Sequence, residues 1–368
     1  MNSFKREKDV NKMQEIRVEL TKNPKAKPQD ENNLTFGTTF SDHMFVMDYK
    51  EGRGWYDPRI VPYAPVALDP AAVCLHYGQT TFEGMKAYRA ADGAINLFRP
   101  DENYKRLNVS DDRLCIPELD VDFCIEATKK LVEIDRDWVP SAPNTSLYIR
   151  PFVFATNPDL ATNAGTEYTF MIITGPTGPY YPEGLNPVKI YVESKYVRAV
   201  KGGTGMAKTG GNYAASMKSG QEAHDQGYSQ VLWLDGVENK YIEEVGAMNI
   251  MFVIGDEVVT PELSGSILSG ITRKSILELL KVEGRKVSER RISIEELEEA
   301  YDKGLLREAF GTGTAAVISP VGVLKYKDKV MTINDGRIGE ISQHLYDSLT
   351  DIQWGRAQGP DGWIVKVC

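Results

Sequence analysis

The sequence predicts an α/β or α+β protein built from two mixed domains. Short apolar segments typical of strands alternate with helical patterns throughout the chain, as they do in these fold classes. Residues 175–184 hold three prolines and three glycines in ten positions, which makes them a good candidate for a linker between two halves. The 368 residues, 42% hydrophobic and 26% charged, provide enough material for a large buried core.

The first half begins with a polar segment, residues 1–33, which we expect to be a mobile or surface-wrapping arm. Strands are expected at 44–49, 85–89, 94–98, 147–154 and 168–174, with a hairpin at Asp92-Gly93. Pro100 opens a helix, because proline suits the first helical turn and the acids that follow it suit the positive end of the helix dipole. A second helix is expected at 123–134.

The second half shows the same alternation. Strands are expected at 188–192, 230–234, 248–254, 257–260 and 315–318, the last entered through a glycine-threonine turn at 311–314. Helices are expected from about 213 to 226, over 271–282, and after a capping box at 293–296. We therefore expect an arm at 1–33, a smaller domain at 34–178, a linker at 179–187 and a larger domain at 188–368.

Composition argues against several classes of function. Lys and Arg total 43 against 52 Asp and Glu, a net charge of −9, which argues against nucleic acid and anionic membranes as partners. The four cysteines form no CxxC pair and the four histidines no HExxH, so no metal site is expected. The first residues lack the apolar stretch of a signal peptide, and the longest apolar runs are far shorter than a membrane span. These features predict a cytoplasmic, reduced protein.

Lys208 is the first candidate for chemistry. Glycines at 202, 203, 205, 210 and 211 surround it with small residues, so its amine can meet a planar cofactor or a carbonyl and form a Schiff base. The alternative is a solvated lysine on a surface loop. Residues 202–209 also nearly match the nucleotide-binding pattern GxxxxGKT, with Ala207 in place of the second glycine. That pattern needs a helix starting at the lysine, which Gly210-Gly211 disfavour, and a nucleotide hydrolase stays as the rival enzyme class.

Further candidates lie near Lys208 in the second half. Glu243 and Glu244 are adjacent in an extended segment, so only one of them can enter a site, where it would need a cationic partner. Residues 269–272 at a helix start and the turn at 311–315 could each hold an anion through backbone N–H groups. Lys105 or Arg106 could add a cation. A lysine, an acid and two anion-binding turns together suit pyridoxal phosphate.

Several ordered motifs then show a family resemblance. GMAKTGGNY at 205–213, EVGAMN at 244–249 and LSGITR at 268–273 are accompanied by shorter matches at 76–78, 82–87, 97–100, 146–151 and 313–315. With these motifs the chain resembles the branched-chain amino acid aminotransferases, class IV enzymes of fold type IV that use pyridoxal 5'-phosphate. The resemblance covers about residues 34–354 and implies an active site between the two domains, with the cofactor held by the larger one.

The resemblance implies a role for each matching residue. Lys208 would be the catalytic residue that bonds to the cofactor aldehyde and shuttles a proton. Glu244 would pair with the pyridine nitrogen, and Tyr213 would bind the phenolic oxygen. The phosphate would be held by Arg106, Ile271, Thr272 and Thr314, while the turn at Thr314-Ala315 would accept the substrate α-carboxylate.

The resemblance also implies an apolar, aromatic substrate pocket, lined by Phe36, Tyr77, Phe82, Tyr148 and Tyr180. Tyr77 matches a residue that reaches in from the other subunit of a homodimer, and Arg150 matches the arginine that binds the distal carboxylate of glutamate. Three departures stand out. Ala247 stands where many members have threonine, Met251 where an aromatic residue is frequent, and residues 315–319 lack the paired cysteines of mammalian members.

The implied function is reversible amino transfer between leucine, isoleucine or valine and 2-oxoglutarate in a homodimer. Neither nucleic acid nor a membrane is expected as a partner. D-amino acid aminotransferase and aminodeoxychorismate lyase are the alternatives within the same fold, and a purely structural dimer is the non-enzymatic one. The sequence does not rank the three substrates.

Overall fold

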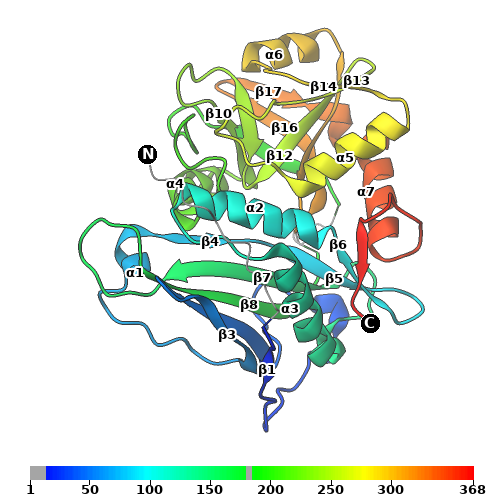
Figure 1. The fold of residues 1–368 in the computed structure, drawn as a ribbon. Helices are drawn as coiled ribbons and strands as arrows, with labels where there is room; N and C mark the ends of the chain where they lie inside the picture. Colours follow the sequence, from blue (N-terminus) through cyan, green and yellow to red (C-terminus); the bar gives the residue numbers. More distant parts are fainter. Residues whose placement is uncertain (1–13, 180–184) are drawn as a thin grey trace.

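The computed structural model describes residues 14–179 and 185–368 and contains two nine-stranded sheets, one above the other in Figure 1. In the first sheet the order is β1-β3-β2-β8-β7-β5-β6-β18, and β4 pairs with β7. In the second the order is β11-β10-β9-β16-β15-β12-β13-β14, and β17 pairs with β16. Because β11 also pairs with β12, the strands from β11 to β12 close into a ring, which leaves no free edge there.

The strands of the first sheet are β1 (Arg17–Val18), β2 (His43–Lys50), β3 (Gly54–Pro62), β4 (Thr80–Phe82), β5 (Met85–Arg89), β6 (Ile95–Phe98), β7 (Ser146–Ala155), β8 (Glu167–Thr177) and β18 (Ile364–Lys366). Those of the second are β9 (Val188–Val192), β10 (Gln230–Leu234), β11 (Ile242–Val245), β12 (Met248–Ile254), β13 (Glu257–Thr260), β14 (Lys286–Glu289), β15 (Leu306–Gly313), β16 (Val317–Tyr326) and β17 (Lys329–Thr332).

The α-helices of the described residues are α1 (Val73–Tyr77), α2 (Pro100–Arg113), α3 (Val121–Ile134), α4 (Gly210–Asp225), α5 (Ile271–Val282), α6 (Ile294–Asp302) and α7 (Glu340–Gln353). Three short 3₁₀ segments lie at Glu31–Asn33, Arg136–Trp138 and Ile333–Gly336. As predicted, Pro100 is the first residue of α2, and Ser293 caps α6 by accepting a hydrogen bond from the N–H of Glu296. None of these helices is long and apolar enough to cross a membrane.

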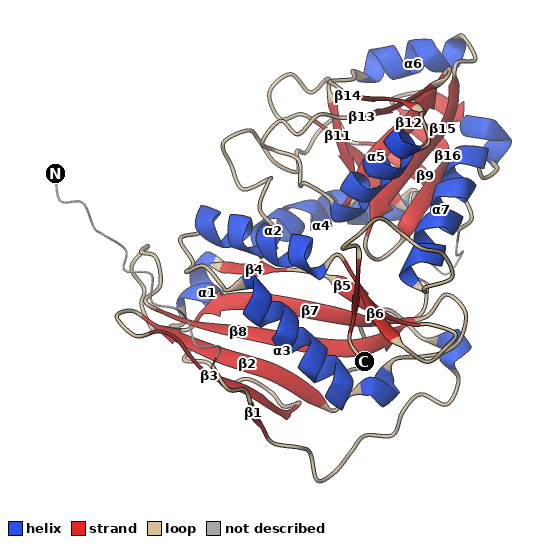
Figure 2. Cartoon of the chain, turned by 45° about the vertical axis from the view of Figure 1, so that its right-hand side comes forward, coloured by secondary structure: helices blue, strands red, loops and turns tan. Residues whose placement is uncertain are grey.

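Apolar side chains form a core in each half and a third core between them. Helices α2 and α3 cover one face of the first sheet (Figure 2), and their buried residues pack against those of β2, β5 and β7. Between the halves, buried residues of α5 and α7 pack with Tyr88 and Phe98 of the first sheet. The guanidinium of Arg99 crosses the same boundary to Glu278, with 3.0 Å between Nη1 and Oε2. These contacts fix the two sheets relative to each other, and the mixed α/β class predicted above is confirmed.

Three predicted boundaries are wrong. Helix α4 begins at Gly210 rather than Tyr213, because Asn212 bonds back to the carbonyls of Thr204 and Ala207 and ties down the first turn despite its two glycines. Strand β8 runs on through residues 175–177, which were expected to start the linker. At Gly175 the strand passes close to the backbone of Thr39. A side chain there would overlap with the Thr39 carbonyl, so the glycine is required by this contact and does not mark the end of the strand.

The third wrong boundary is the glycine-threonine segment. Residues 311–313 are the end of β15, and the turn is Thr314–Ala316, so the next strand begins at Val317 rather than at residue 315. Gly311 is needed for packing, since a Cβ there would lie 2.8 Å from Cε of Met248 on β12.

Both ends of the described chain lie on the first sheet. Residues 14–33 follow its edge, where β1 pairs with β3 and the N–H of Thr21 donates to Nε2 of His43 over 2.9 Å. Strand β18 pairs with β6, so the last residues return to the sheet of the first half. Residues 1–13 and 180–184 lie outside the described part, and the division of the chain into an arm, two domains and a linker stays a prediction.

Candidate active site

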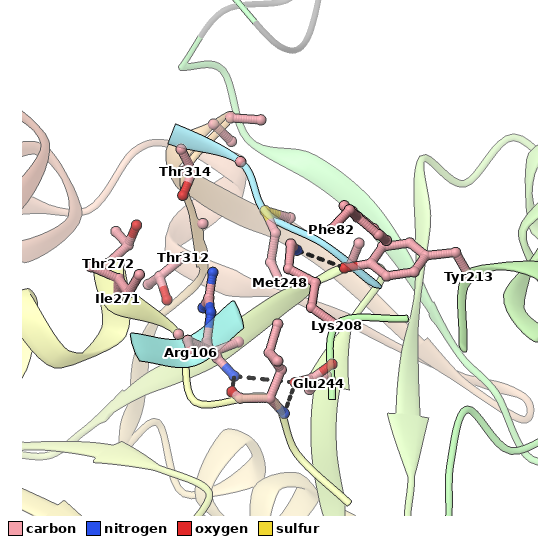
Figure 3. A pocket seen from close by; sticks show the side chains of 18 of the residues that line it. Phe82, Arg106, Lys208, Tyr213, Glu244, Met248, Ile271, Thr272, Thr312 and Thr314 are labelled. Atoms are coloured by element: carbon pink, nitrogen blue, oxygen red, sulfur yellow. Dashed lines mark hydrogen bonds between the residues drawn. The ribbon is translucent and has the colours of Figure 1, made fainter. Parts of the chain in front are cut away.

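A pocket between the two sheets gathers residues from both halves of the chain (Figure 3). From the first half it is lined by Phe36, Phe82, Gly84, Arg106, Tyr148 and Arg150, and from the second by residues around Lys208, β11, β12, the start of α5 and the turn after β15. The predicted site residues on its wall are Phe36, Phe82, Arg106, Tyr148, Arg150, Lys208, Tyr213, Glu244, Ile271, Thr272, Thr314 and Ala315.

The backbone around Lys208 is held from both sides. Its N–H donates to Oγ of Ser110 over 2.8 Å, and its carbonyl accepts from the N–H of Phe82 over 3.0 Å. Its Nζ donates to Oη of Tyr213 over 2.8 Å, and Figure 3 shows the two side chains pointing toward each other. The amine is therefore presented to the pocket beside a phenol, not to solvent on a free loop.

The acid pair behaves as strand alternation predicts. Glu244 lines the pocket, whereas Glu243 points to the other side of β11 and bonds to Oγ of Ser266. Glu244 Oε1 accepts from the N–H of Leu268 over 2.8 Å, and Oε2 lies 3.0 Å from Nε of Arg198. Burial raises the pKa of Glu244, and the Arg198 guanidinium opposes that rise. A buried acid is thus aimed into the pocket and partly balanced by one cation.

At the opposite end of the pocket, several donors converge. Helix α5 starts there with Gly270 as its N-cap, so no side chain satisfies the first N–H groups of the helix. Oγ1 of Thr312 is buried without a hydrogen-bond partner. Figure 3 places Thr272, Thr312 and Thr314 around the guanidinium of Arg106. Free N–H groups, hydroxyls and a cation together suit a phosphate.

Arg106 itself is oriented by a buried acid. Its Nε and Nη2 donate to Glu83 over 2.7 and 2.8 Å, and its Nη1 donates to the carbonyl of Ser269 over 2.9 Å. Burial alone would raise the pKa of Glu83, but the Arg106 guanidinium, together with Lys208 and Asn103, holds the pKa below its usual value. Lys105, the other cation considered from the sequence, pairs with Asp101 on the surface of α2 and is not part of this pocket wall.

The remaining wall is aromatic, with one guanidinium. The rings of Phe36 and Tyr148 meet edge to face with centroids 4.8 Å apart. The Arg150 guanidinium lies 4.8 Å from the Phe82 ring centroid, and its Nη2 donates to Oη of Tyr148 over 3.2 Å. Gly84 keeps this wall open, because a Cβ there would overlap with Oη of Tyr148. The wall can take an aliphatic side chain and also offers a charge.

One predicted substrate residue in the described part of the chain, Tyr77, is not on this wall. Tyr77 ends α1, is 43% exposed, and donates through its Oη to the carbonyl of Leu160. It contributes nothing to the pocket of its own chain. Tyr180 lies outside the described residues.

Several residues that shape the pocket were not predicted from the sequence. Asn249 and Glu83 stand inside the quoted motifs but received no role, and Thr312 stands inside the glycine-threonine segment. Asn249 donates to the carbonyl of Leu268 over 2.9 Å, and so ties β12 to the loop before α5. Arg198 lies in a stretch with no motif, so no sequence signal could have identified it as the partner of Glu244.

The objection raised above against a nucleotide-binding loop was wrong, because a helix does begin two residues after Lys208. The geometry nevertheless differs from such a loop. The amine of Lys208 is bonded to Tyr213, and the helix start that faces the cluster of donors is that of α5, not α4.

Comparisons with known proteins identify the family. The class IV amino-transferase model matches residues 80–323. Branched-chain-amino-acid aminotransferase 2 of Bacillus subtilis (strain 168) is 59% identical over 354 residues, which make up 96% of this chain and 97% of that protein. The chain belongs to the branched-chain amino acid aminotransferases. Its membership in this family sets aside the nucleotide hydrolase and the purely structural protein.

Solved structures of branched-chain aminotransferases share the fold. The Escherichia coli enzyme matches with a TM-score of 0.74 at 28% identity, over 88% of this chain and 99% of that one. The T.th. enzyme complexed with N-(5'-phosphopyridoxyl)-L-glutamate matches with 0.71 at 26% identity, and its complex with 4-methylvaleric acid with 0.71 at 27%. Both of these cover 88% of this chain and 98% of theirs. The predicted fold-type IV architecture is confirmed.

Proposed function

We propose that this protein transfers amino groups reversibly between leucine, isoleucine or valine and 2-oxoglutarate, with pyridoxal 5'-phosphate as its cofactor. The observation that carries the proposal is that Lys208, Glu244 and the donor cluster at α5 line one pocket, where they would serve the aldehyde, ring nitrogen and phosphate of a single cofactor. The family supports it, and so do the relatives described above with a phosphopyridoxyl-glutamate and a branched aliphatic acid.

The residues present fit this cofactor. Thr312 Oγ1 lacks a partner and the N-terminus of α5 has no side-chain cap, so both have donors to spare for a phosphate. Arg106 adds charge there, together with the hydroxyls of Thr272 and Thr314. Tyr213 would bind the phenolic oxygen and Glu244 the ring nitrogen, and both side chains line the same pocket as Lys208.

When bound, pyridoxal 5'-phosphate supplies an aldehyde that condenses with amines and a ring that accepts the electron pair released when the substrate Cα–H bond breaks. Lys208 would hold the cofactor aldehyde through its Nζ, and the same amine would carry the proton from the substrate Cα. Glu244 would hold the ring nitrogen in its protonated form. Arg198 and the N–H of Leu268 hold the Glu244 carboxylate in place for that task.

One pocket must accept two kinds of substrate, the branched aliphatic amino acids and the dicarboxylates glutamate and 2-oxoglutarate. The aromatic wall of Phe36, Phe82 and Tyr148 suits a branched aliphatic side chain, and the turn at Thr314-Ala315 suits the α-carboxylate. Arg150 binds the distal carboxylate of glutamate and 2-oxoglutarate, and bonds to Tyr148 when an aliphatic substrate replaces them. Tyr180 belongs to the same proposed wall.

Tyr77 lies away from its own pocket, which supports the proposal that it completes the pocket of a second subunit in a homodimer. Free cysteines at positions 74, 115, 124 and 368 support a reducing, cytoplasmic location.

Colour and covalent labelling test the proposal directly. The purified protein should be yellow, and borohydride should fix the cofactor to Lys208, as mass spectrometry of peptides would show. A Lys208→Ala variant should lose turnover and the label while still binding the cofactor through its phosphate. A label on another lysine, or none, would contradict the assignment.

A panel of substrates separates the proposed reaction from its relatives in the fold. Leucine, isoleucine and valine should change the absorbance of the bound cofactor, and their D-enantiomers should not. Release of pyruvate from aminodeoxychorismate would instead identify the lyase.

A further inference from the structure

A buried lysine lies behind the wall of the active site. Lys86 on β5 is only 7% exposed, and its Nζ donates to the carbonyl oxygen of Ala315 over 2.8 Å. This hydrogen bond joins the first sheet to the turn between β15 and β16 of the second.

The turn separates two cavities. Thr314, Ala315 and Ala316 line the active-site pocket, and Ala315 and Ala316 also line a second cavity that Lys86 shares. Lys86 therefore contacts the turn from the side opposite the pocket.

The conformation of the turn needs support from outside. Val317, the residue that follows it, has a φ of +61°, which a β-branched residue rarely adopts. Such a conformation persists only where surrounding contacts hold it. Val317 is buried in the core between the two halves, and Lys86 holds the carbonyl two residues before it.

Peptide geometry links Lys86 to the substrate. In a planar trans peptide the C=O and the following N–H point in opposite directions. Because the Ala315 carbonyl points to Lys86, the N–H of Ala316 points away from it, toward the active-site side of the turn. We propose that Lys86 is a positioning residue that directs this N–H into the pocket to bind the substrate α-carboxylate.

Charge adds to this orienting effect. Burial lowers the pKa of Lys86 to about 8, and no carboxylate among residues 14–179 and 185–368 offsets that effect. Burying an ammonium costs free energy, so a side chain that only filled this space would be better apolar. The cation polarises the Ala315–Ala316 peptide and attracts a carboxylate on its far side. This inference rests on the proposed function, because it presupposes an amino-acid substrate.

Two leucine analogues separate carboxylate binding from everything else. 4-Methylvaleric acid keeps the carboxylate and lacks the amine, whereas 3-methylbutylamine keeps the amine and lacks the carboxylate. Binding of each to the holoenzyme would be titrated by calorimetry or by the absorbance of the cofactor. Lys86→Met removes the donor and charge at similar length. Lys86→Arg keeps the hydrogen-bond donor and the positive charge. The neighbouring cavity has space for the larger guanidinium group.

Lys86→Met should lower the binding affinity for 4-methylvaleric acid at least tenfold. It should also raise KM for leucine and for 2-oxoglutarate, since each of these substrates carries an α-carboxylate. The affinity for 3-methylbutylamine should stay within about twofold. Lys86→Arg should stay within about threefold of the wild type for both probes. Lys129→Met, which removes a surface lysine on α3, is the matched control and should change neither affinity.

Unchanged binding of 4-methylvaleric acid to Lys86→Met would overturn the inference. Equal losses for both analogues would do the same, because they would indicate a general structural role. If Lys86→Met does not fold, Lys86→Gln replaces it; this variant keeps a donor without charge and should show a smaller loss confined to the acid. Failure of the proposed function is distinguishable, since the wild-type holoenzyme itself would then not convert leucine.

Discussion

Glu243 and Glu244 are neighbours with the same chemistry and different surroundings. Glu244→Gln preserves the size of the side chain but cannot keep a proton on the cofactor ring nitrogen. We expect kcat with leucine to fall at least about 100-fold, in the range of general acid-base contributions, with the cofactor still bound. Steady-state kinetics and cofactor absorbance would measure both effects.

The control for that experiment is Glu243→Gln, which changes the side chain bonded to Ser266 on the other face of the strand. It should stay within a few-fold of the wild type. Loss of activity in Glu243→Gln with near-normal turnover in Glu244→Gln would exchange the two roles.

Arg150 combines a packing role with a charge. In Arg150→Met the side chain still packs against Phe82 and Tyr148 but offers no guanidinium to a distal carboxylate. Losing a hydrogen-bonded charge partner typically costs about 1.5–3 kcal/mol, so kcat/KM for 2-oxoglutarate should fall roughly 10- to 100-fold. The value for leucine should change less than about fivefold. Arg53→Met, which removes an exposed arginine stacked on Tyr56, is the control, and equal losses for both substrates would contradict the assignment.

At the scale of single residues, the sequence was most informative where chemistry and backbone freedom coincide. Lys208 among glycines, and an acid in a strand, could be found from their neighbours alone. Arg198 and Lys86 could not, because each acts through a partner far away in the sequence: Glu244 in one case and the carbonyl of Ala315 in the other. Such pairs exist only after the two sheets have packed.

At the scale of elements, the three wrongly predicted boundaries all lie at glycines. Gly175 and Gly311 lie inside strands because another part of the chain passes too close for a side chain, and Gly210 lies inside a helix whose first turn is tied to a loop. Local patterns treat glycine as a turn or a break, whereas these three positions respond to tertiary contacts. Strands and helices with strong periodicity, such as β12 and α5, were predicted with their observed bounds.

Gly270 at the start of α5 gives an element-scale prediction. A Cβ there would overlap with Oδ1 of Asn249, which helps to hold the loop before the helix. Gly270→Ala should therefore displace the start of α5 and raise the cofactor dissociation constant at least about tenfold, since this helix N-terminus is the proposed phosphate site. Gly220→Ala is the control, because Gly220 lies in α4 with open space around it. It should leave cofactor binding unchanged and raise the free energy of unfolding by up to about 1 kcal/mol.

Asp111 is a buried acid of α2 that should make the free energy of unfolding depend on pH. Burial raises its pKa to about 8, with a smaller contribution from Glu83, and Thr81 donates to its Oδ1. Between about pH 4 and 8 the folded state keeps a proton that the unfolded state releases, so this group lowers the free energy of unfolding as pH rises, by up to about 1.4 kcal/mol for each pH unit. Asp111→Asn imitates the neutral acid and should flatten this fall.

Unfolding measured from pH 5 to 8.5 would test that prediction. The gain in stability from Asp111→Asn should be larger at pH 8 than at pH 5. Asp112→Asn, at the exposed neighbouring position, should leave the slope as it is in the wild type. A slope unchanged by Asp111→Asn would mean that the carboxyl is ionised in the folded protein.

At the scale of the whole molecule, the site depends on two sheets being held together. Phe36, Arg106 and Arg150 come from the first half, and Lys208 and Glu244 from the second. The core around α5 and α7, with the ion pair of Arg99 and Glu278, keeps the two sets in register. A change in that core should therefore alter the pocket geometry even where it touches no substrate.

The proposed role of Tyr77 would extend this dependence to a second copy of the chain. If this residue completes the partner's pocket, Tyr77→Ala on one subunit and Lys208→Ala on the other damage the same pocket of a mixed dimer, and the second pocket keeps both residues. Each homodimer should be strongly impaired, whereas the purified hybrid, isolated through two affinity tags, should recover about half of the wild-type activity. A hybrid of Lys208→Ala with Glu244→Gln should recover nothing, since both residues serve the pocket of their own chain. If the first hybrid is no more active than Tyr77→Ala alone, Tyr77 acts within its own subunit or not at all, and the shared site has to be abandoned.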